Sequence, residues 1–284
     1  MILALVKRNL KLYFRDKVSV FFSLLGVFII IGLYVVFLGN MMTRYVDQFI
    51  DDQTISSSLM RSWIMAGVIS VTTITTCNGA FGIMVEDTAL SRMRDFKVSP
   101  IKRWQLVLSY VISAMVVGLI MSLLTLILSE IYIYVSGGTI LSFPALLKVL
   151  FYIFLSVFSS SALIFFIMSF LKSQNAFGTA SSIIGTLIGF LTGIYIPIGN
   201  LPTGVQTIIK IFPLSHSGVL LRQVMMGEVV DISYIDNNLK IFLGINYQVN
   251  GEFLSNLVHF AYLLVSGVVF YLLAIVVVAR KRSK

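Results

Sequence analysis

The sequence predicts an all-α integral membrane protein of about six transmembrane helices. Of its 284 residues, 58% are hydrophobic and only 12% are charged, whereas soluble domains carry roughly 25% charged residues. The apolar residues also lie in runs that reach the roughly 20 residues a helix needs to cross a bilayer. These runs do not alternate with polar residues as the strands of a membrane barrel do.

Six apolar runs mark the predicted spans. They lie at about Val18–Gly39, Trp63–Val85, Gln105–Val135, Pro144–Leu171, Ala176–Ile198 and Leu254–Ala279. Because a bilayer offers no water to the backbone, each run must close its own hydrogen bonds, as a helix does. The first run is too long for a signal-peptide core and no small-residue cleavage site follows it. We therefore expect a single membrane domain over residues 18–284.

The distribution of lysine and arginine predicts that both chain ends are cytoplasmic. With a cytoplasmic N-terminus, fifteen of these cations fall in inner segments and six in outer ones. Cytoplasmic loops carry the excess of Lys and Arg in multi-pass membrane proteins. The net charge of +9 is therefore explained by the cations that flank the spans on the cytoplasmic side, and we expect no nucleic-acid partner.

Residues 1–17 predict an amphipathic helix that lies in the membrane surface. On a helical wheel its apolar side chains gather on one face and its cations on another, the cations being Lys7, Arg8, Lys11 and Arg15. Such a helix places its apolar face at the acyl boundary and its cations among anionic lipid headgroups. It is either a topology anchor alone or an arm that a cytoplasmic partner can move.

A cytoplasmic loop over residues 86–104 joins the second and third spans. Leu90, Met93 and Phe96 fall near helical spacing, so a short helix is expected. Ser99-Pro100 should end that helix, because proline disfavours the α conformation in the residue before it. The loop is either an ordinary positive-inside segment or a short helix that a soluble motor domain grips.

Residues 199–253 form a predicted extracytoplasmic segment. Its first part holds a short apolar run between prolines, which is too brief to span and predicts a re-entrant or interfacial helix; the residues that mark it are Pro197, Pro202, Phe212 and Pro213. Such backbone is tolerated at membrane depth where protein covers it or where it lines a cavity. The polar part, 227–253, contains Asn-Asn and Asn-Gly pairs that allow a small β-hairpin.

The sequence shows no pattern typical of catalysis, of a metal site or of ATP binding. His216 and His259 lack metal-like or triad-like neighbours, and the single cysteine, Cys77, is expected to be a small hydrophobe inside a span. No phosphate-binding loop is present. We expect no enzymatic activity and no cofactor bound by this chain. Ionisable residues are almost absent from the middle of the spans, which disfavours ion-coupled transport.

The order of several short motifs resembles the membrane subunit of ABC-2 type ABC transporters over nearly the whole chain. They are Glu86, Val98-Ser99-Pro100-Ile101, Leu201-Pro202, Phe212-Pro213-Leu214, Leu221-Arg222 and Gly227. Two places depart from the family pattern. Asp87-Thr88-Ala89 stands where a glycine often follows the loop glutamate, and Ser109-Tyr110 stands where a Gly-Lys pair often enters the third span. The outer segment is also longer than usual.

This resemblance implies a permease subunit that pairs with a second copy or a homologous permease. Each permease would bind a separate ABC ATPase subunit, which carries the ATP and Mg. The loop would be the coupling helix seated in that ATPase, through Glu86, Leu90, Met93, Phe96, Ser99 and Pro100. The family implies export, and a path lined by aromatic and small polar residues suits a hydrophobic or amphiphilic cargo, such as a lipid, a drug, or an antimicrobial or membrane-active peptide. A bacterial plasma membrane and a role in drug or peptide resistance are the expected setting.

Two alternative functions are also compatible with the sequence. One is a secondary transporter or channel that works alone, against which the uncharged spans and the absence of inverted halves count. The other is a membrane sensor subunit, in which the outer segment binds an extracellular peptide or antibiotic and the loop signals inward.

Overall fold

The computed structural model describes residues 1–34, 39–50, 52–90, 92, 96 and 101–280, and in this part of the chain nearly every ordered element is a helix. The elements are α1 (Ile2–Arg15), α2 (Lys17–Leu33), α3 (Gly39–Val46), α4 (Gln53–Ala89), α6 (Arg103–Val135), α7 (Phe143–Met168), α8 (Gln174–Leu191), η2 (Ile198–Asn200), α9 (Thr203–Ile211), α10 (Pro213–Gly227), η3 (Ile232–Tyr234), α11 (Asn237–Leu243), β1 (Gln248–Val249), β2 (Glu252–Phe253) and α12 (Asn256–Arg280). The all-α prediction is confirmed.

Four of these helices are long and apolar enough to cross a membrane, by length and composition, among the described residues. They are α4, α6, α7 and, within α12, Asn256–Val278. The first and fifth predicted spans correspond to α2 and α8, which have 17 and 18 residues and do not meet that criterion. An α-helix rises 1.5 Å per residue, so the 18 residues of α8 are slightly shorter than the roughly 30 Å of a hydrocarbon core, whereas α2 runs up to residues outside the described part of the chain.

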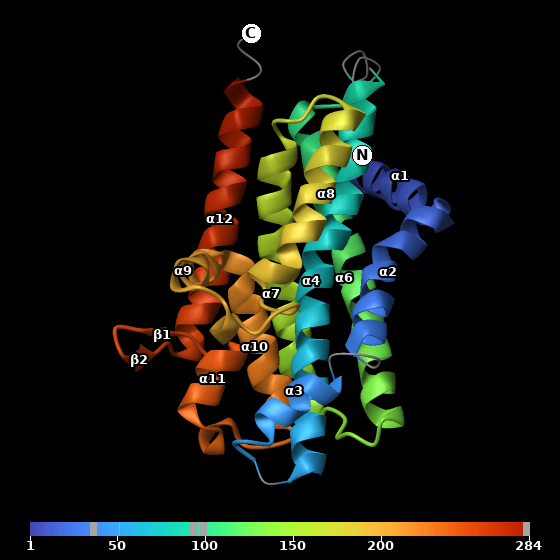
Figure 1. Ribbon diagram of the computed structural model, residues 1–284. Coiled ribbons are helices and arrows are strands. Elements are labelled where there is room, and N and C mark those ends of the chain that lie inside the picture. Colours follow the sequence, from blue (N-terminus) through green and yellow to red (C-terminus); the bar gives the residue numbers. More distant parts are fainter. Residues whose placement is uncertain (35–38, 51, 91, 93–95, 97–100, 281–284) are drawn as a thin grey trace.

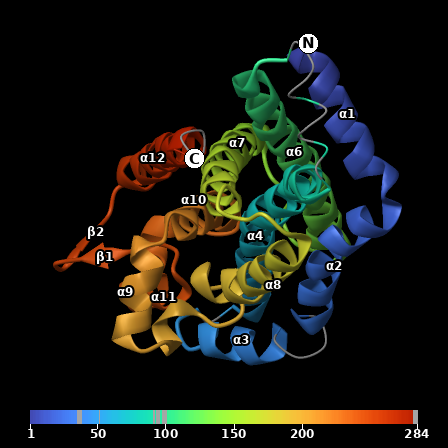
Figure 2. The same cartoon turned by 90° about the horizontal axis from the view of Figure 1, so that it is seen from above.

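Helix α4 forms the centre of the bundle, with α6, α7, α8, α10 and α2 around it (Figure 2). Small residues let the neighbouring helices approach closely, as is common in membrane bundles. At Gly118 on α6, an added Cβ would lie only 2.8 Å from Cys77 Sγ on α4 and 3.0 Å from Val157 Cγ1 on α7. Hydroxyl groups add links between helices, such as the 2.9 Å hydrogen bond between Thr73 and Ser160.

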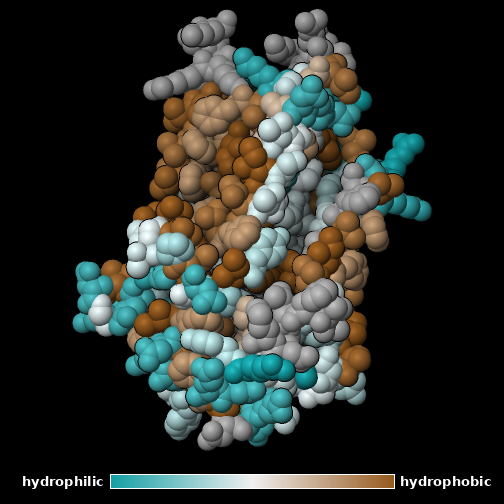
Figure 3. Space-filling view, viewed as in Figure 1, coloured by the Kyte–Doolittle hydropathy of each residue, from teal (hydrophilic) through white to brown (hydrophobic). Residues whose placement is uncertain are grey.

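The two ends of the bundle differ in character (Figure 1). At one end α4 and α12 finish and α6 begins, with α1 lying across the side; we call this the terminal end. At the opposite end, α3, α11 and the first turns of α4 form a cap that is largely hydrophilic on the face shown in Figure 3, below a broad apolar band.

Between α8 and α12 the chain does not run straight to the opposite end. Gly193 adopts a left-handed conformation, with φ of 66°, and turns the chain out of α8 into η2 and α9. Helix α10 then packs against α4, α7 and α12, and the chain continues through η3 and α11 to a two-stranded hairpin. There Gln248 pairs with Phe253 and Val249 with Glu252.

The hairpin expected within 227–253 is confirmed. Its turn residues, Asn250 and Gly251, both have positive φ, at 53° and 88°. A two-residue turn of this kind needs positive φ at both positions, and Asn-Gly is its preferred sequence.

Candidate functional site

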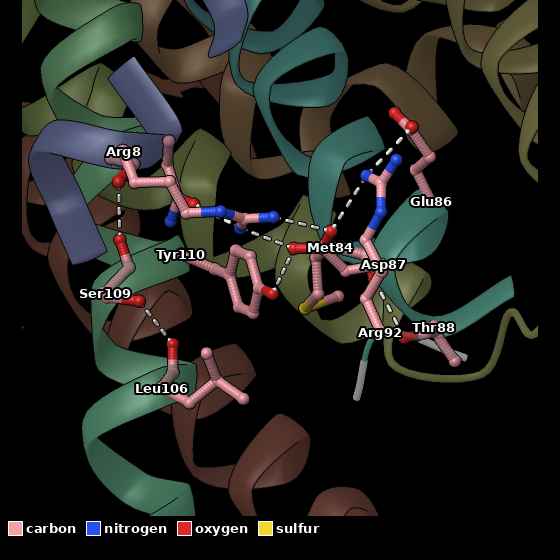
Figure 4. Close-up of polar contacts among 11 residues, drawn as sticks. Arg8, Met84, Glu86, Asp87, Thr88, Arg92, Leu106, Ser109 and Tyr110 are labelled. Atoms are coloured by element: carbon pink, nitrogen blue, oxygen red, sulfur yellow. Dashed lines mark hydrogen bonds and ion pairs between the residues drawn. The ribbon is translucent and has the colours of Figure 1, made fainter. Parts of the chain in front are cut away.

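A buried carboxylate joins three helices at the terminal end of the bundle (Figure 4). Asp87, in the last turn of α4, has a fully buried side chain. Arg8 of α1 donates to both of its oxygens, at 2.6 and 2.8 Å, and the Tyr110 hydroxyl of α6 donates to Oδ2 at 2.6 Å. We call Arg8, Asp87, Tyr110 and Arg92 the Asp87 cluster.

Arg92 approaches the same carboxylate from the other side. Its guanidinium lies 3.3 Å from Asp87 Oδ1 and 3.2 Å from Glu86 Oε1. Arg8 also lies over the Phe96 ring, 5.5 Å from its centroid. The hydrogen bonds from Arg8 to Asp87 raise the pKa of the Arg8 guanidinium above its usual value, so this pair stays charged at any physiological pH. The interfacial helix is therefore fastened to the ends of α4 and α6.

The placement of Arg8 differs from the expectation for the interfacial helix. Lys7, Lys11 and Arg15 are exposed, as cations that face headgroups would be, but Arg8 turns toward the protein. The reason is Asp87, 79 residues away in the sequence. The helix contacts the bundle through a face whose buried residues are Leu5, Val6, Asn9 and Tyr13.

The structure describes half of the six residues expected to couple to an ATPase. Glu86 pairs with Arg92, Leu90 is 55% exposed just past the end of α4, and Phe96 lies under Arg8. Met93, Ser99 and Pro100 lie outside the described residues. Glu86 and Phe96 are thus brought together around the Asp87 cluster, while Leu90 points to the exterior.

A cavity of about 720 Å³ lies between α2, α4 and α8, beside the Asp87 cluster. Most of its wall is apolar or bears small hydroxyl and amide groups, with residues such as Val27, Val71, Thr75 and Asn78. Its charged lining residues among those described are Asp16, Glu86 and Arg92, and all three belong to the terminal end. The cavity and the Asp87 cluster therefore share Arg92, and Glu86, which pairs with Arg92, also lines the cavity.

The residues expected in the outer re-entrant segment mark where its elements begin and end. Pro197 precedes η2, Pro202 precedes α9, and Phe212 is both the C-cap of α9 and the N-cap of α10. Pro213 is the first residue of α10, where the missing amide proton costs nothing because that donor has no partner within the helix.

Arg222 of α10 is a buried arginine whose role sequence reasoning missed. Its guanidinium donates to the carbonyls of Thr192, Gly193 and Gly244, at 3.0 to 3.3 Å, and lies 4.7 Å from the Trp63 ring centroid. Burial lowers the pKa of Arg222 to about 10. The carboxyl ends of α8 and α11 supply the negative dipole ends that compensate this charge. Its position in the Leu221-Arg222 motif was the available signal.

The comparison with protein families decides the class. The model of the ABC-2 type transporter family matches residues 1–226. This chain belongs to the ABC-2 type transporter family. No curated protein matches the chain. The ABC-2 match includes α1, the Asp87 cluster, the cavity, η2, α9 and α10 through Met226, and it leaves η3, α11, the hairpin and α12 outside.

Membership in the ABC-2 family confirms the resemblance and an integral membrane protein, and it identifies the chain as an ABC transporter permease subunit. ABC-2 membrane domains are permeases and not ATPases, and the family implies an ABC ATPase partner in general.

Proposed function

We propose that this ABC-2 permease exports a hydrophobic or amphiphilic cargo across the plasma membrane, driven by a separate ATPase subunit. The observation that carries the proposal is the position of Glu86 and Arg92. Both lie in the last turn of α4 or just after it, both contact one another near Asp87, and both line the cavity. A movement imposed on this loop would therefore reach the cavity wall directly.

The interfacial helix is the second part of this mechanism. Because Asp87 binds Arg8 and Tyr110, a push on α1 or on the loop would move α1, α4 and α6 together. Helix α8 forms the other wall of the cavity and packs mainly against α4, with only Ile188 and Gly189 buried. We infer that ATP-driven closure of the partner shifts α4 relative to α8. The partner must favour one arrangement by differential contact energy, since equal binding to both shifts nothing.

The cargo class follows from the cavity wall. Its apolar side chains and hydroxyls suit lipid-like or membrane-active molecules such as a lipid, a drug or an antimicrobial peptide, and its charges are confined to the terminal end. A polyanionic or polycationic cargo would lose its hydration in the rest of the cavity without compensation.

A second permease, identical or homologous, is proposed to cover the exposed face of α8. That face appears in Figure 3 as a pale stripe between apolar surfaces, and its exposed residues include Gly178, Thr179, Ser182, Gly185 and Thr186. Small residues of this kind favour close approach of a second helix in a membrane.

The topology proposed is N- and C-termini in the cytoplasm, with the lipid headgroups of the inner leaflet around α1. Lysines and arginines of the described residues concentrate at the terminal end, including Lys7, Lys11, Arg15 and Lys102. Carboxylates concentrate at the opposite end, including Asp52, Asp231 and Asp236. This is the asymmetry expected from the positive-inside rule.

Co-purification from the native host tests the proposal. The tagged chain, solubilised in mild detergent, should carry a stoichiometric ATPase. Leu90→Asp should lose that ATPase, because Leu90 is an exposed apolar residue at the proposed contact, 55% exposed. Ile140→Asp is the matched control at the opposite end, 52% exposed, and should retain it. Absence of any ATPase from the wild-type preparation, under conditions that preserve other membrane complexes, would reject the proposal.

A further inference from the structure

The two histidines of the chain meet in a buried pair. His216 on α10 and His259 on α12 are 43 residues apart, yet their Nδ1 atoms lie 2.7 Å from each other. Their side chains are almost completely buried, at 1% and 0% exposure. Their contact could not be foreseen from the sequence, in which each histidine lacks metal-like or triad-like neighbours.

The outer nitrogens of both rings must carry protons. His216 Nε2 lies 2.9 Å from the carbonyl oxygen of Lys210, which can only accept. His259 Nε2 lies 2.9 Å from Oδ1 of Asn246. The backbone N–H of Tyr247 donates to that same Oδ1 at 2.7 Å, so this atom is the amide oxygen and not the nitrogen.

If both rings were neutral, the two Nδ1 atoms would then face each other as acceptors. A neutral imidazole carries one proton, and in each ring that proton is already placed on Nε2. Two lone pairs at 2.7 Å repel, whereas one proton between them makes a charge-assisted hydrogen bond of ordinary length. We propose that His216 and His259 form a proton-binding site in which one proton is shared between their Nδ1 atoms, and that it holds the re-entrant segment to α12.

The surroundings of the pair can stabilise a single positive charge. The carboxyl end of α9 adjoins it: the Lys210 carbonyl contacts His216 Nε2, and the carbonyls of Ile209 and Ile211 accept from the neighbouring hydroxyls of Ser215 and Tyr262. A protonated histidine is favoured at a helix carboxyl end. The Tyr262 ring also stacks on His216, with centroids 4.3 Å apart and an interplanar angle of 23°, a geometry that favours a cation over an aromatic face.

Other features around the pair oppose a second positive charge on it. Lys210 of α9 turns its ammonium group to the Gln248 carbonyl at 3.0 Å, and both histidines lie in the first turn of their helices, where positive charge is disfavoured. Burial lowers the pKa of His216, so every positive charge on the pair carries a desolvation cost; the Nδ1–Nδ1 hydrogen bond offsets that cost for one proton, and nothing comparable offsets it for a second.

The remaining neighbours do not titrate in the same range. Tyr247 packs edge-on against both rings, and burial raises its pKa to about 12. Helices α4 and α7 present neutral hydroxyls to this part of α10, since Ser70 and Ser156 contact Ser217.

A metal ion does not fit between the rings as they lie. Zinc binds imidazole nitrogen at about 2.0–2.1 Å, so two nitrogens on one tetrahedral ion are about 3.3 Å apart. The observed Nδ1 separation is shorter, at 2.7 Å. No third His, Cys, Asp or Glu joins the pair among the described residues.

Selective labelling makes the shared proton directly observable, because the chain contains only two histidines. The full chain, labelled with ¹⁵N-histidine and purified in detergent with a chelator, has four ring nitrogens to follow by NMR between pH 5 and 9. We expect both Nε2 atoms protonated throughout and one further proton coupled to both Nδ1 atoms near neutral pH, lost on the alkaline side. Two unprotonated Nδ1 atoms at every pH, or stoichiometric zinc in the unchelated protein that is absent from His259→Gln, would overturn the proposal.

Thermal unfolding across the same pH range gives an independent readout. Above the ordinary histidine pKa of about 6.5 the unfolded pair holds no proton while the folded pair holds one, so the melting temperature should fall as pH rises, by about 2–4 °C for each pH unit. Subtracting the profile of His259→Gln isolates this slope. Asn246→Asp should extend this fall in melting temperature to higher pH, because a carboxylate stabilises the shared cation and raises the pKa of the folded pair. Parallel profiles for the wild type and His259→Gln above pH 6.5 would contradict the shared proton. None of these measurements depends on transport, so they stand apart from the proposed export.

Discussion

Removing the arginine from the Asp87 cluster should destabilise the protein more than neutralising the aspartate. In Arg8→Gln the buried carboxylate of Asp87 keeps only Tyr110 and the longer contact to Arg92, at 3.3 Å. In Asp87→Asn the guanidinium of Arg8, whose side chain is 30% exposed, can turn to water. Buried charges that lose their partner are penalised most when water cannot reach them.

The magnitude follows from the contacts that each variant loses. Arg8 makes two short hydrogen bonds to the carboxylate, and hydrogen bonds to charged groups contribute about 1.5–3 kcal/mol each. Partial exposure of Arg8 screens the pair, so we expect about 2–4 kcal/mol for Arg8→Gln and about 1–2 kcal/mol for Asp87→Asn. The double variant leaves no unpaired charge between these two positions and should cost less than the sum, by about 1–2 kcal/mol.

Thermal or denaturant unfolding of the purified full chain, run as a double-mutant cycle, measures these differences. Lys11→Gln is the matched control, since Lys11 is an exposed cation on the same helix and should change stability by less than about 0.5 kcal/mol. Additive effects of Arg8→Gln and Asp87→Asn, or a larger cost for Asp87→Asn, would refute the account of a carboxylate that depends on Arg8.

Three further outcomes follow from the structure. Gly193→Ala should destabilise the chain by about 1–3 kcal/mol, because Gly193 has φ of 66° and an added Cβ would lie 2.7 Å from a side-chain carbon. Gly185→Ala is the control within a single subunit: an added Cβ there meets open space, and alanine has the higher helix propensity, so this change should not lower the melting temperature. Arg222→Met should lower the melting temperature and speed amide hydrogen exchange in the segments that Arg222 joins, while Arg44→Met, at an exposed position, should do neither. Cys77, fully buried and the single thiol, should react with a maleimide only after denaturation.

Hydropathy located the long helices well but could not set all of their ends. The third predicted span, Gln105–Val135, nearly coincides with α6. The second, Trp63–Val85, finds only the middle of α4, which begins ten residues earlier. There Asp52 accepts hydrogen bonds from the amides of Thr54 and Ile55, and the polar first turns of α4 are part of the hydrophilic cap at the opposite end. Hydropathy measures the preference of a segment for lipid. It therefore detects the part of a helix inside the apolar band and misses the polar turns that extend beyond it.

Contacts between distant segments were beyond the sequence for a different reason. The charges of Arg8 and Arg222 were visible, but an arginine is equally suited to water, to a headgroup or to a buried partner. Only the fold decides which of these it meets. From the sequence, Arg8 was therefore expected to face lipid headgroups, and no contact between the two histidines was expected. In the structure, the packing of α1 on α4 places Arg8 within 3 Å of Asp87, and the packing of α10 on α12 places His216 within 3 Å of His259.

Two of the positions that depart from the family pattern meet in the structure. Asp87 lies beside the loop glutamate, and Tyr110 lies where a Gly-Lys pair often enters the third span; in this chain the two side chains bind each other at 2.6 Å. A buried aspartate is tolerable only with donors around it, and a buried tyrosine hydroxyl needs an acceptor. Tyr110→Phe alone should therefore weaken the attachment of α1, since Asp87 loses a hydrogen-bond donor. The double variant Asp87→Asn, Tyr110→Phe should lower the free energy of unfolding by less than the sum of the two single variants. In this chain the Asp87–Tyr110 hydrogen bond therefore joins the two positions and, together with Arg8, ties α1 to the bundle.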